Sequence, residues 1–102
     1  MSVLDDVLLE EYERLNRFKQ AYISKIEELP KGYMSHKKIG KKRYAYLQWR
    51  EGSKVISQYI SNNEISIFEQ RIEERKKYQQ RLQVVESDIK KIKKVVGIID
   101  NP

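Results

Sequence analysis

Aromatic and basic residues gather in the middle third of the chain in a pattern that suits binding. The stretch from Tyr44 to Arg50 reads YAYLQWR, and further Lys and Arg residues stand on both sides of it. Tyrosine offers a flat apolar ring with a hydrogen-bonding tip, and Lys or Arg offers affinity for phosphate. We expect the basic residues to contact phosphates and the tyrosines to stack on bases or line a groove. The candidate binding residues are Lys37, Lys41, Lys42, Arg43, Tyr44, Tyr46, Arg50, Lys54 and Tyr59.

The net charge of +6 comes from the same part of the chain. Residues 31–61 hold eight Lys or Arg and one acid (+7), residues 1–30 hold four and seven (−3), and residues 62–102 hold nine and seven (+2). Such a local excess is typical of a surface that meets nucleic acid or an acidic protein. A plainer interpretation is that the lysines protect sheet edges from aggregation and the tyrosine pairs only stiffen a small sheet.

The sequence offers little for catalysis. Cysteine is absent, which excludes disulfides and a thiol nucleophile. His36 is the only histidine, and no acid is expected beside it, so we do not expect it to act as a general base or metal ligand. Gly40-Lys41-Lys42 lacks the other residues of a phosphate loop. We therefore expect a non-enzymatic protein with no cofactor, no metal and no small-molecule substrate.

The candidate residues are expected to lie in a sheet, because apolar and polar residues alternate with a period of two in residues 31–61. Two dipeptides, Gly40-Lys41 and Gly52-Ser53, separate three such segments, and a Gly in the first loop position suits a type II′ hairpin turn. These features predict a three-stranded antiparallel meander with strands at Tyr33–Ile39, Lys42–Glu51 and Lys54–Ser61.

Two-residue turns also fix which side chains share a face of this meander. Leu47 should lie beside Met34 and Gln58, and Ala45 beside His36 and Ile60, so this mainly apolar face, which also includes Trp49, should pack on the helices. The opposite face should stay open. It is expected to display Tyr33, Ser35, Lys37, Tyr44, Tyr46, Gln48, Arg50, Val55, Ser57 and Tyr59.

A long charged helix is expected on each side of the sheet. In residues 1–30, apolar residues recur by threes and fours from Leu8 to Leu29, which predicts a helix over about Val3 to Glu28. Ser2 is the expected N-cap, and Pro30 should end the helix. The second helix is expected over residues 62–99, with Asn62 and Asn63 as plausible caps.

The second helix carries an apolar stripe with coiled-coil spacing. Ile65, Phe68 and Ile72 fall out of phase with it, so the seam should change partner there. The helices are expected to pair as an antiparallel coiled coil, and the overhanging stripe should make a homodimer. Its residues are Tyr78, Leu82, Val85, Ile89, Ile92, Val96 and Ile99, of which all but Ile99 are assigned to the oligomer interface.

A resemblance supports this interpretation. The stretch LPKG at 29–32, YAYLQWREG at 44–52, Lys54 and Tyr59-Ile60 resembles a pattern in short, largely uncharacterised proteins of Gram-positive bacteria, phages and mobile elements. The sheet is also similar to the three-stranded DNA-binding sheet of some tyrosine integrases, although that sheet packs on one short helix and precedes a catalytic domain. The resemblance implies a protein of a phage or mobile element.

We therefore expect one α+β domain over residues 1–102 that binds nucleic acid or nucleoprotein through the open sheet face. A protein-binding inhibitor or antitoxin-like partner, of the anti-CRISPR type, is the alternative, and a structural coiled-coil adaptor is a third. The chain has no run of about 18 uncharged apolar residues, so we expect no membrane span and a cytoplasmic setting.

Overall fold

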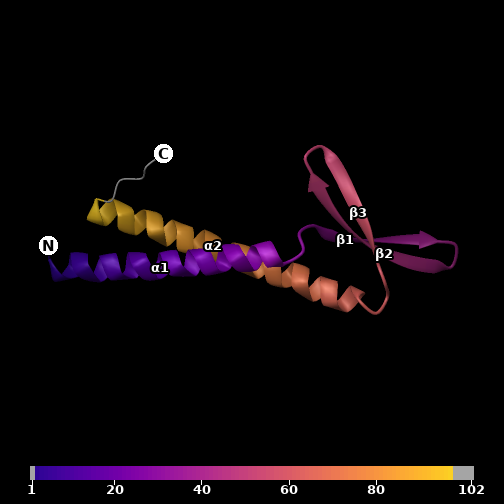
Figure 1. Ribbon diagram of the computed structural model, residues 1–102, viewed down its shortest axis with the longest axis horizontal. Coiled ribbons are helices and arrows are strands. Elements are labelled where there is room, and N and C mark those ends of the chain that lie inside the picture. Colours follow the sequence, from indigo (N-terminus) through magenta and orange to yellow (C-terminus); the bar gives the residue numbers. More distant parts are fainter. Residues whose placement is uncertain (1, 98–102) are drawn as a thin grey trace. The chain divides into compact units, whose positions relative to one another are not determined.

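The computed structural model describes residues 2–97 and has the expected order of elements (Figure 1). Helix–sheet–helix order confirms the α+β class. The chain divides into two compact units, residues 1–27 with 77–102 and residues 28–76, and each has its own core. One domain over residues 1–102 stays a prediction. The elements are α1 (Val3–Glu28), β1 (Tyr33–Ile39), β2 (Lys42–Glu51), β3 (Lys54–Ile60) and α2 (Ile65–Val96).

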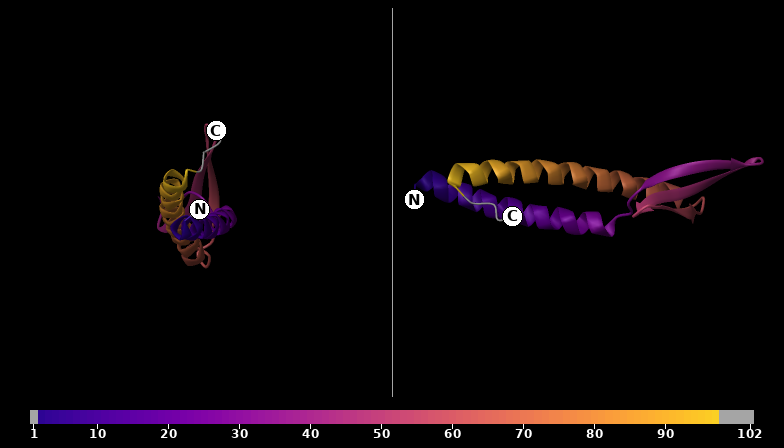
Figure 2. Two further views of the ribbon diagram at one scale, coloured as in Figure 1. Left: turned by 90° about the vertical axis from the view of Figure 1, so that its left-hand side faces the viewer. Right: turned by 90° about the horizontal axis from the view of Figure 1, so that it is seen from above.

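In the first unit, α1 and the later part of α2 lie side by side and run in opposite directions (Figures 1 and 2). Leu15 of α1 is buried against Val85, Ile89 and Ile92 of α2. Nearer the other end of α1, the rings of Tyr22 and Tyr78 meet with centroids 5.8 Å apart. The predicted pairing of the two helices is therefore confirmed.

Local side-chain contacts explain where α1 begins and how its surface is held. The Asp5 backbone N–H donates to Ser2 Oγ at 3.2 Å, which confirms the expected N-cap. Further along the exposed surface of α1, Arg14 donates to both carboxylate oxygens of Glu11, and these hydrogen bonds lower the pKa of Glu11 below its usual value. An exposed pair of this kind adds little to stability.

The second unit contains the meander, with strand order β1-β2-β3. The predicted register is confirmed, since Leu47 pairs with Met34 and Gln58, and Ala45 pairs with His36 and Ile60. Both hairpin turns have Gly at positive φ, 65° at Gly40 and 61° at Gly52. Among the described residues only glycines have positive φ, so the second turn residues, Lys41 and Ser53, have negative φ. A type II′ turn requires this combination, with positive φ at its first central residue only.

The three strands overlap only in part. β1 pairs with residues 42–48 of β2, and β3 pairs with residues 45–51, so only residues 45–48 have a neighbouring strand on both sides. Beyond this overlap the sheet continues as two separate two-stranded hairpins. The β1–β2 and β2–β3 hairpins point in clearly different directions (Figure 1).

The core of the second unit lies between one sheet face and the first turns of α2. Ala45, Leu47 and Ile60 are almost fully buried there and pack with Ile72. Phe68, like Ile65, packs against the same cluster. This confirms that the seam of α2 changes partner, because its first apolar residues meet the sheet and its later ones meet α1. Among the described residues, this core contains side chains of the sheet and of α2 and none of α1. The apolar sheet face had been expected to pack on both helices.

Two boundaries and the burial of one side chain differ from the expectation. α2 begins at Ile65, because residues 61–64 form a turn in which the Glu64 N–H donates to the Ser61 carbonyl at 2.9 Å. β3 ends at Ile60, and Ile99 lies outside the described residues. Trp49 lies on the predicted face but is only half-buried, and its indole N–H donates to Glu51 Oε1 at 3.0 Å.

The chain approaches β1 through a position that only glycine fits. Gly32 has a φ of 105°, a conformation that side chains strongly disfavour. A Cβ atom there would also overlap the backbone carbonyl of Gln48. Gly32 therefore allows the segment before β1 to pass close against β2.

Neither described helix has a stretch sufficiently long and apolar for a membrane crossing.

Candidate functional site

Three tyrosines form one aromatic cluster on the open face of the sheet. Tyr46 and Tyr59 are direct cross-strand partners, and their rings meet edge to face with centroids 5.9 Å apart and an interplanar angle of 68°. Tyr44 approaches Tyr59 from β2, with centroids 6.3 Å apart. Tyr59 is 52% exposed although it contacts both other rings. We call Tyr44, Tyr46 and Tyr59 the tyrosine cluster.

A cation adjoins this cluster. Lys37 Nζ lies 5.1 Å from the centroid of the Tyr46 ring, within the range of a cation–π contact. Lys37 also pairs with Tyr44 across the β1–β2 ladder, which places it on the same face. The open face thus presents a positive charge directly against the half-buried ring of Tyr46.

The structure divides the predicted binding residues between two faces. Strand residues that alternate with the buried residues Ala45 and Leu47 lie on the open face. The remaining strand residues lie on the opposite face, which carries the core. Arg43 and Lys54 belong to the second group, since they pair with Lys38 and Glu51 in the ladders. Lys41 lies in the turn. The predicted binding residues on the open face are Lys37, Lys42, Tyr44, Tyr46, Arg50 and Tyr59.

Near the end of the β1–β2 hairpin, basic side chains line a small hollow. A pocket of about 230 Å³ is lined by His36, Lys37, Lys38 and Arg43. His36 and Lys38 were not among the predicted binding residues. The register could have identified them, because the two-residue turn already pairs Lys38 with Arg43 and leaves His36 next along the same face.

The two hairpin ends differ sharply in charge. Residues 37–44, which end the β1–β2 hairpin, include five Lys or Arg and no acid. Residues 49–56, which end the β2–β3 hairpin, include two basic residues and one acid. If the lysines only protected sheet edges from aggregation, both hairpin ends should carry similar charge. The difference in charge therefore favours a specific role for the β1–β2 hairpin.

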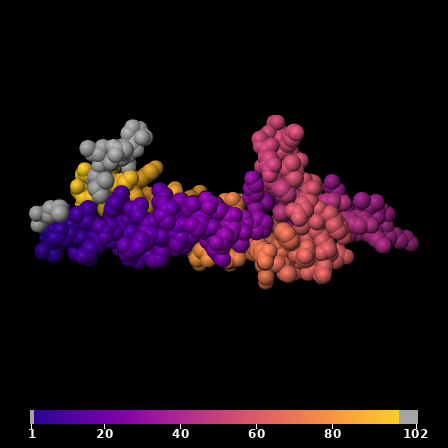
Figure 3. Space-filling model, viewed as in Figure 1, coloured from indigo at the N-terminus to yellow at the C-terminus, as the bar shows by residue number. Residues whose placement is uncertain are grey.

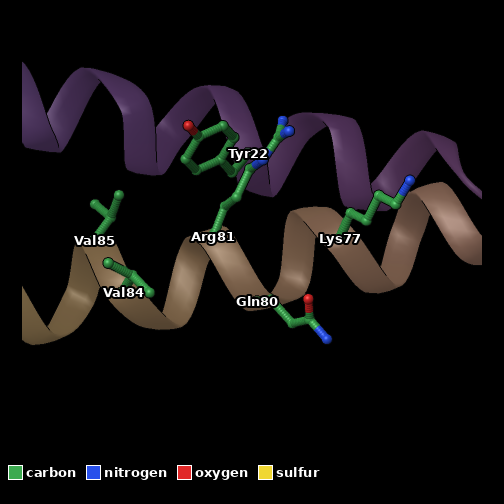
Figure 4. A pocket seen from close by; sticks show the side chains of 6 residues that line it. All are labelled: Tyr22, Lys77, Gln80, Arg81, Val84 and Val85. Atoms are coloured by element: carbon green, nitrogen blue, oxygen red, sulfur yellow. The ribbon is translucent and has the colours of Figure 1, made fainter.

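The first unit has a separate pocket of about 360 Å³ between its helices (Figure 4). Tyr22 comes from α1, and the other lining side chains, which include Lys77, Arg81 and Val85, come from α2. The Arg81 guanidinium lies 5.5 Å from the centroid of the Tyr78 ring. The pocket therefore combines apolar and basic side chains, and no sequence pattern predicted it.

The predicted oligomer-interface residues lie along the seam between the helices. Val85, Ile89 and Ile92 are buried in the core of the helix pair, and Val96 packs against it. Tyr78 contacts Tyr22, and Leu82 is half-buried. A homodimer through this stripe would have to displace α1 from it.

Residues 2–97 bring together no group of three or more acidic or histidine side chains that could hold a metal ion. The chain belongs to the family of the domain of unknown function DUF6788, whose model matches residues 6–70. The matched segment contains most of α1, the entire meander and the start of α2. No curated protein and no solved structure matches the chain.

Proposed function

We propose that this DUF6788 chain binds nucleic acid, alone or within a nucleoprotein, through the open face of its meander. The observation that carries the proposal is the tyrosine cluster, in which Tyr59 is exposed and Tyr44 and Tyr46 are half-buried, with Lys37 against the ring of Tyr46. Aromatic rings give a surface on which bases stack, and adjacent cations meet the phosphates that flank every base.

The two kinds of side chain would contribute differently. The Lys and Arg residues would release counterions from the nucleic acid, which makes affinity depend steeply on salt. The tyrosines would contribute through stacking or groove contacts that salt barely affects. Arg50, at the far end of the same face, extends the basic surface beyond the tyrosine cluster.

A protein-binding inhibitor or antitoxin-like function is the second proposal, and one feature favours it. Val55 is the cross-strand partner of Arg50 on the open face and is 55% exposed. Tyrosine, arginine and an exposed aliphatic side chain are also the components of protein interfaces. Such an interface would show a weaker dependence of affinity on salt than a phosphate surface.

Binding to fluorescently labelled oligonucleotides tests the first proposal. Anisotropy would be measured with duplex DNA, duplex RNA and single strands of unrelated sequences, between 50 and 200 mM salt. We expect binding whose log Kd against log salt has a slope of several units, roughly 0.7 to 0.9 per phosphate contacted. No binding to any of them at 50 mM salt would overturn the proposal and favour the protein partner.

Homodimerisation remains a separate proposal. The helix pair buries the relevant stripe within the chain, so a dimer would form most readily if two chains exchanged α1. Light scattering at micromolar concentrations would detect it. A constant mass of 12.3 kDa would contradict the homodimer without affecting the proposed binding surface.

A further inference from the structure

We infer that the end of the β1–β2 hairpin, residues 37–44, enters the major groove of a B-form DNA duplex. This inference rests on the proposed function and makes it more specific, because it names the ligand as double-stranded DNA. It also assigns a role to a part of the sheet that shares Tyr44 with the tyrosine cluster and lies outside the core. We call residues 37–44 the basic arm.

The first argument is shape. Beyond Ala45 the basic arm has no third strand, since β3 ends opposite that residue. Three residue pairs and a two-residue turn extend from there, a reach of roughly 14 Å at about 3.4 Å per residue. The major groove is about 12 Å wide and 8.5 Å deep and admits a two-stranded ribbon. In the space-filling view the arm projects as a narrow extension (Figure 3).

The second argument is charge on both sides of the ribbon. Lys37 and Lys42 lie on the open face, and Lys38 and Arg43 lie on the opposite face. A ribbon inside a groove has a phosphate backbone on either side, so both faces need cations there. A sheet that lay flat on a single strand would need them on one face only. Residues 29–50 contain no acid that would oppose such an approach.

The third argument is an apolar side chain at the end of the arm. Ile39 pairs with Lys42 and is 60% exposed, and it belongs to neither core cluster. In the DNA major groove the C5 methyl group of thymine is the apolar feature of the base edges. RNA lacks that methyl group, and its A-form major groove is too narrow for such a ribbon. The arm therefore suits DNA better than RNA.

The test compares the same sequence as a DNA duplex, an RNA duplex and a single DNA strand, with the full chain at one salt concentration. We expect the DNA duplex to bind roughly tenfold or more tightly than the RNA duplex. A duplex that carries glucosylated 5-hydroxymethylcytosine, which fills the major groove, should lose most of this affinity. Netropsin, which occupies the minor groove, should not compete.

Charge variants locate the contact on the arm. Replacement of Lys41 and Lys42 together by Ala should weaken binding to the DNA duplex and make the salt slope shallower by about two units. Lys90 and Lys91 are exposed on α2, and the matched double replacement there should change neither quantity. Circular dichroism would verify that both variants keep the wild-type fold.

The outcomes separate the inference from the function on which it rests. Tight binding that is equal for RNA, for single strands or for the groove-filled duplex would overturn the major-groove inference and leave nucleic-acid binding intact. An unchanged salt slope in the Lys41/Lys42 variant would also overturn it. Absence of binding to every oligonucleotide would overturn both.

Discussion

Lys37 Nζ lies 5.1 Å from the centre of the Tyr46 ring, so a cation of β1 and an aromatic ring of β2 meet on the open face. The same Tyr46 ring contacts Tyr59 on its other neighbouring strand. Tyr46 is therefore the residue that joins the basic and aromatic parts of the proposed binding surface. Its replacement should affect binding more than that of any other single tyrosine.

Tyr46→Ala should weaken binding to nucleic acid by roughly 1 to 3 kcal/mol, because it removes an aromatic surface that stacks on bases or lines a groove. The salt slope should stay close to that of the wild type, since no cation is lost. Tyr46→Phe keeps the ring and is the matched control, with near wild-type affinity. Anisotropy titrations at several salt concentrations measure both quantities. Equal losses in the two variants would show that the hydroxyl, and not the ring, makes the contact.

Arg50→Ala should make the salt slope shallower by about one unit, whereas Lys54→Ala, on the opposite face, should leave the slope nearly unchanged. Both side chains are exposed, so the melting temperature should hardly change. Lys90→Ala removes an equal charge from α2 and serves as the control. If all three variants reduce the slope equally, the dependence reflects net charge and not a defined surface.

Gly32→Ala should destabilise the second unit, because the new Cβ would overlap the Gln48 carbonyl and the residue would have to keep a φ of 105°. Gly52 also has positive φ, but a Cβ there meets nothing within 4 Å. Gly52→Ala should therefore cost about 1 kcal/mol and Gly32→Ala clearly more. Chemical denaturation followed by Trp49 fluorescence provides the comparison, and equal costs would contradict the close approach at Gly32.

Leu47→Ala and Ile89→Asp should damage different units. Leu47 is 4% exposed in the sheet core, and its truncation should cost about 2 to 5 kcal/mol. Ile89 is buried in the core of the helix pair, where a carboxylate has no partner, so Ile89→Asp should reduce helical circular dichroism. Because the sheet has its own core, Trp49 fluorescence should persist in Ile89→Asp. Its loss would show that the sheet cannot fold without the helix pair.

The meander and α1 could be predicted closely because local rules determine them. A period of two and Gly at the first turn position act within a few residues, and together they determine the register from Met34 to Ile60. The open face followed from that register. The Ser2 cap acts over an equally short range at the start of α1. The start of α2 was predicted too early, because the Ser61 turn depends on a backbone hydrogen bond that the sequence does not reveal.

Other features depend on partners that are distant in the sequence. The heptad stripe around Ile89 predicts a partner helix but does not say whether it belongs to the same chain, and the structure places α1 there. Half-burial of Trp49 depends on how far the first turns of α2 cover the sheet. His36 and Lys38 were not predicted, because the local charge of the sequence does not show which side chains the hairpin brings together with Arg43.

The partial overlap of the strands has a consequence for the timescale on which parts of the sheet open. Backbone amides of residues 45–48 have neighbouring strands on both sides and lie over the buried cluster, so they should exchange with deuterium most slowly. Toward Gly40 and Gly52 the ladder is two strands wide, and exchange should become progressively faster. The sheet would then open from its two tips inward, and the residues proposed to meet DNA first would be those least constrained by the fold.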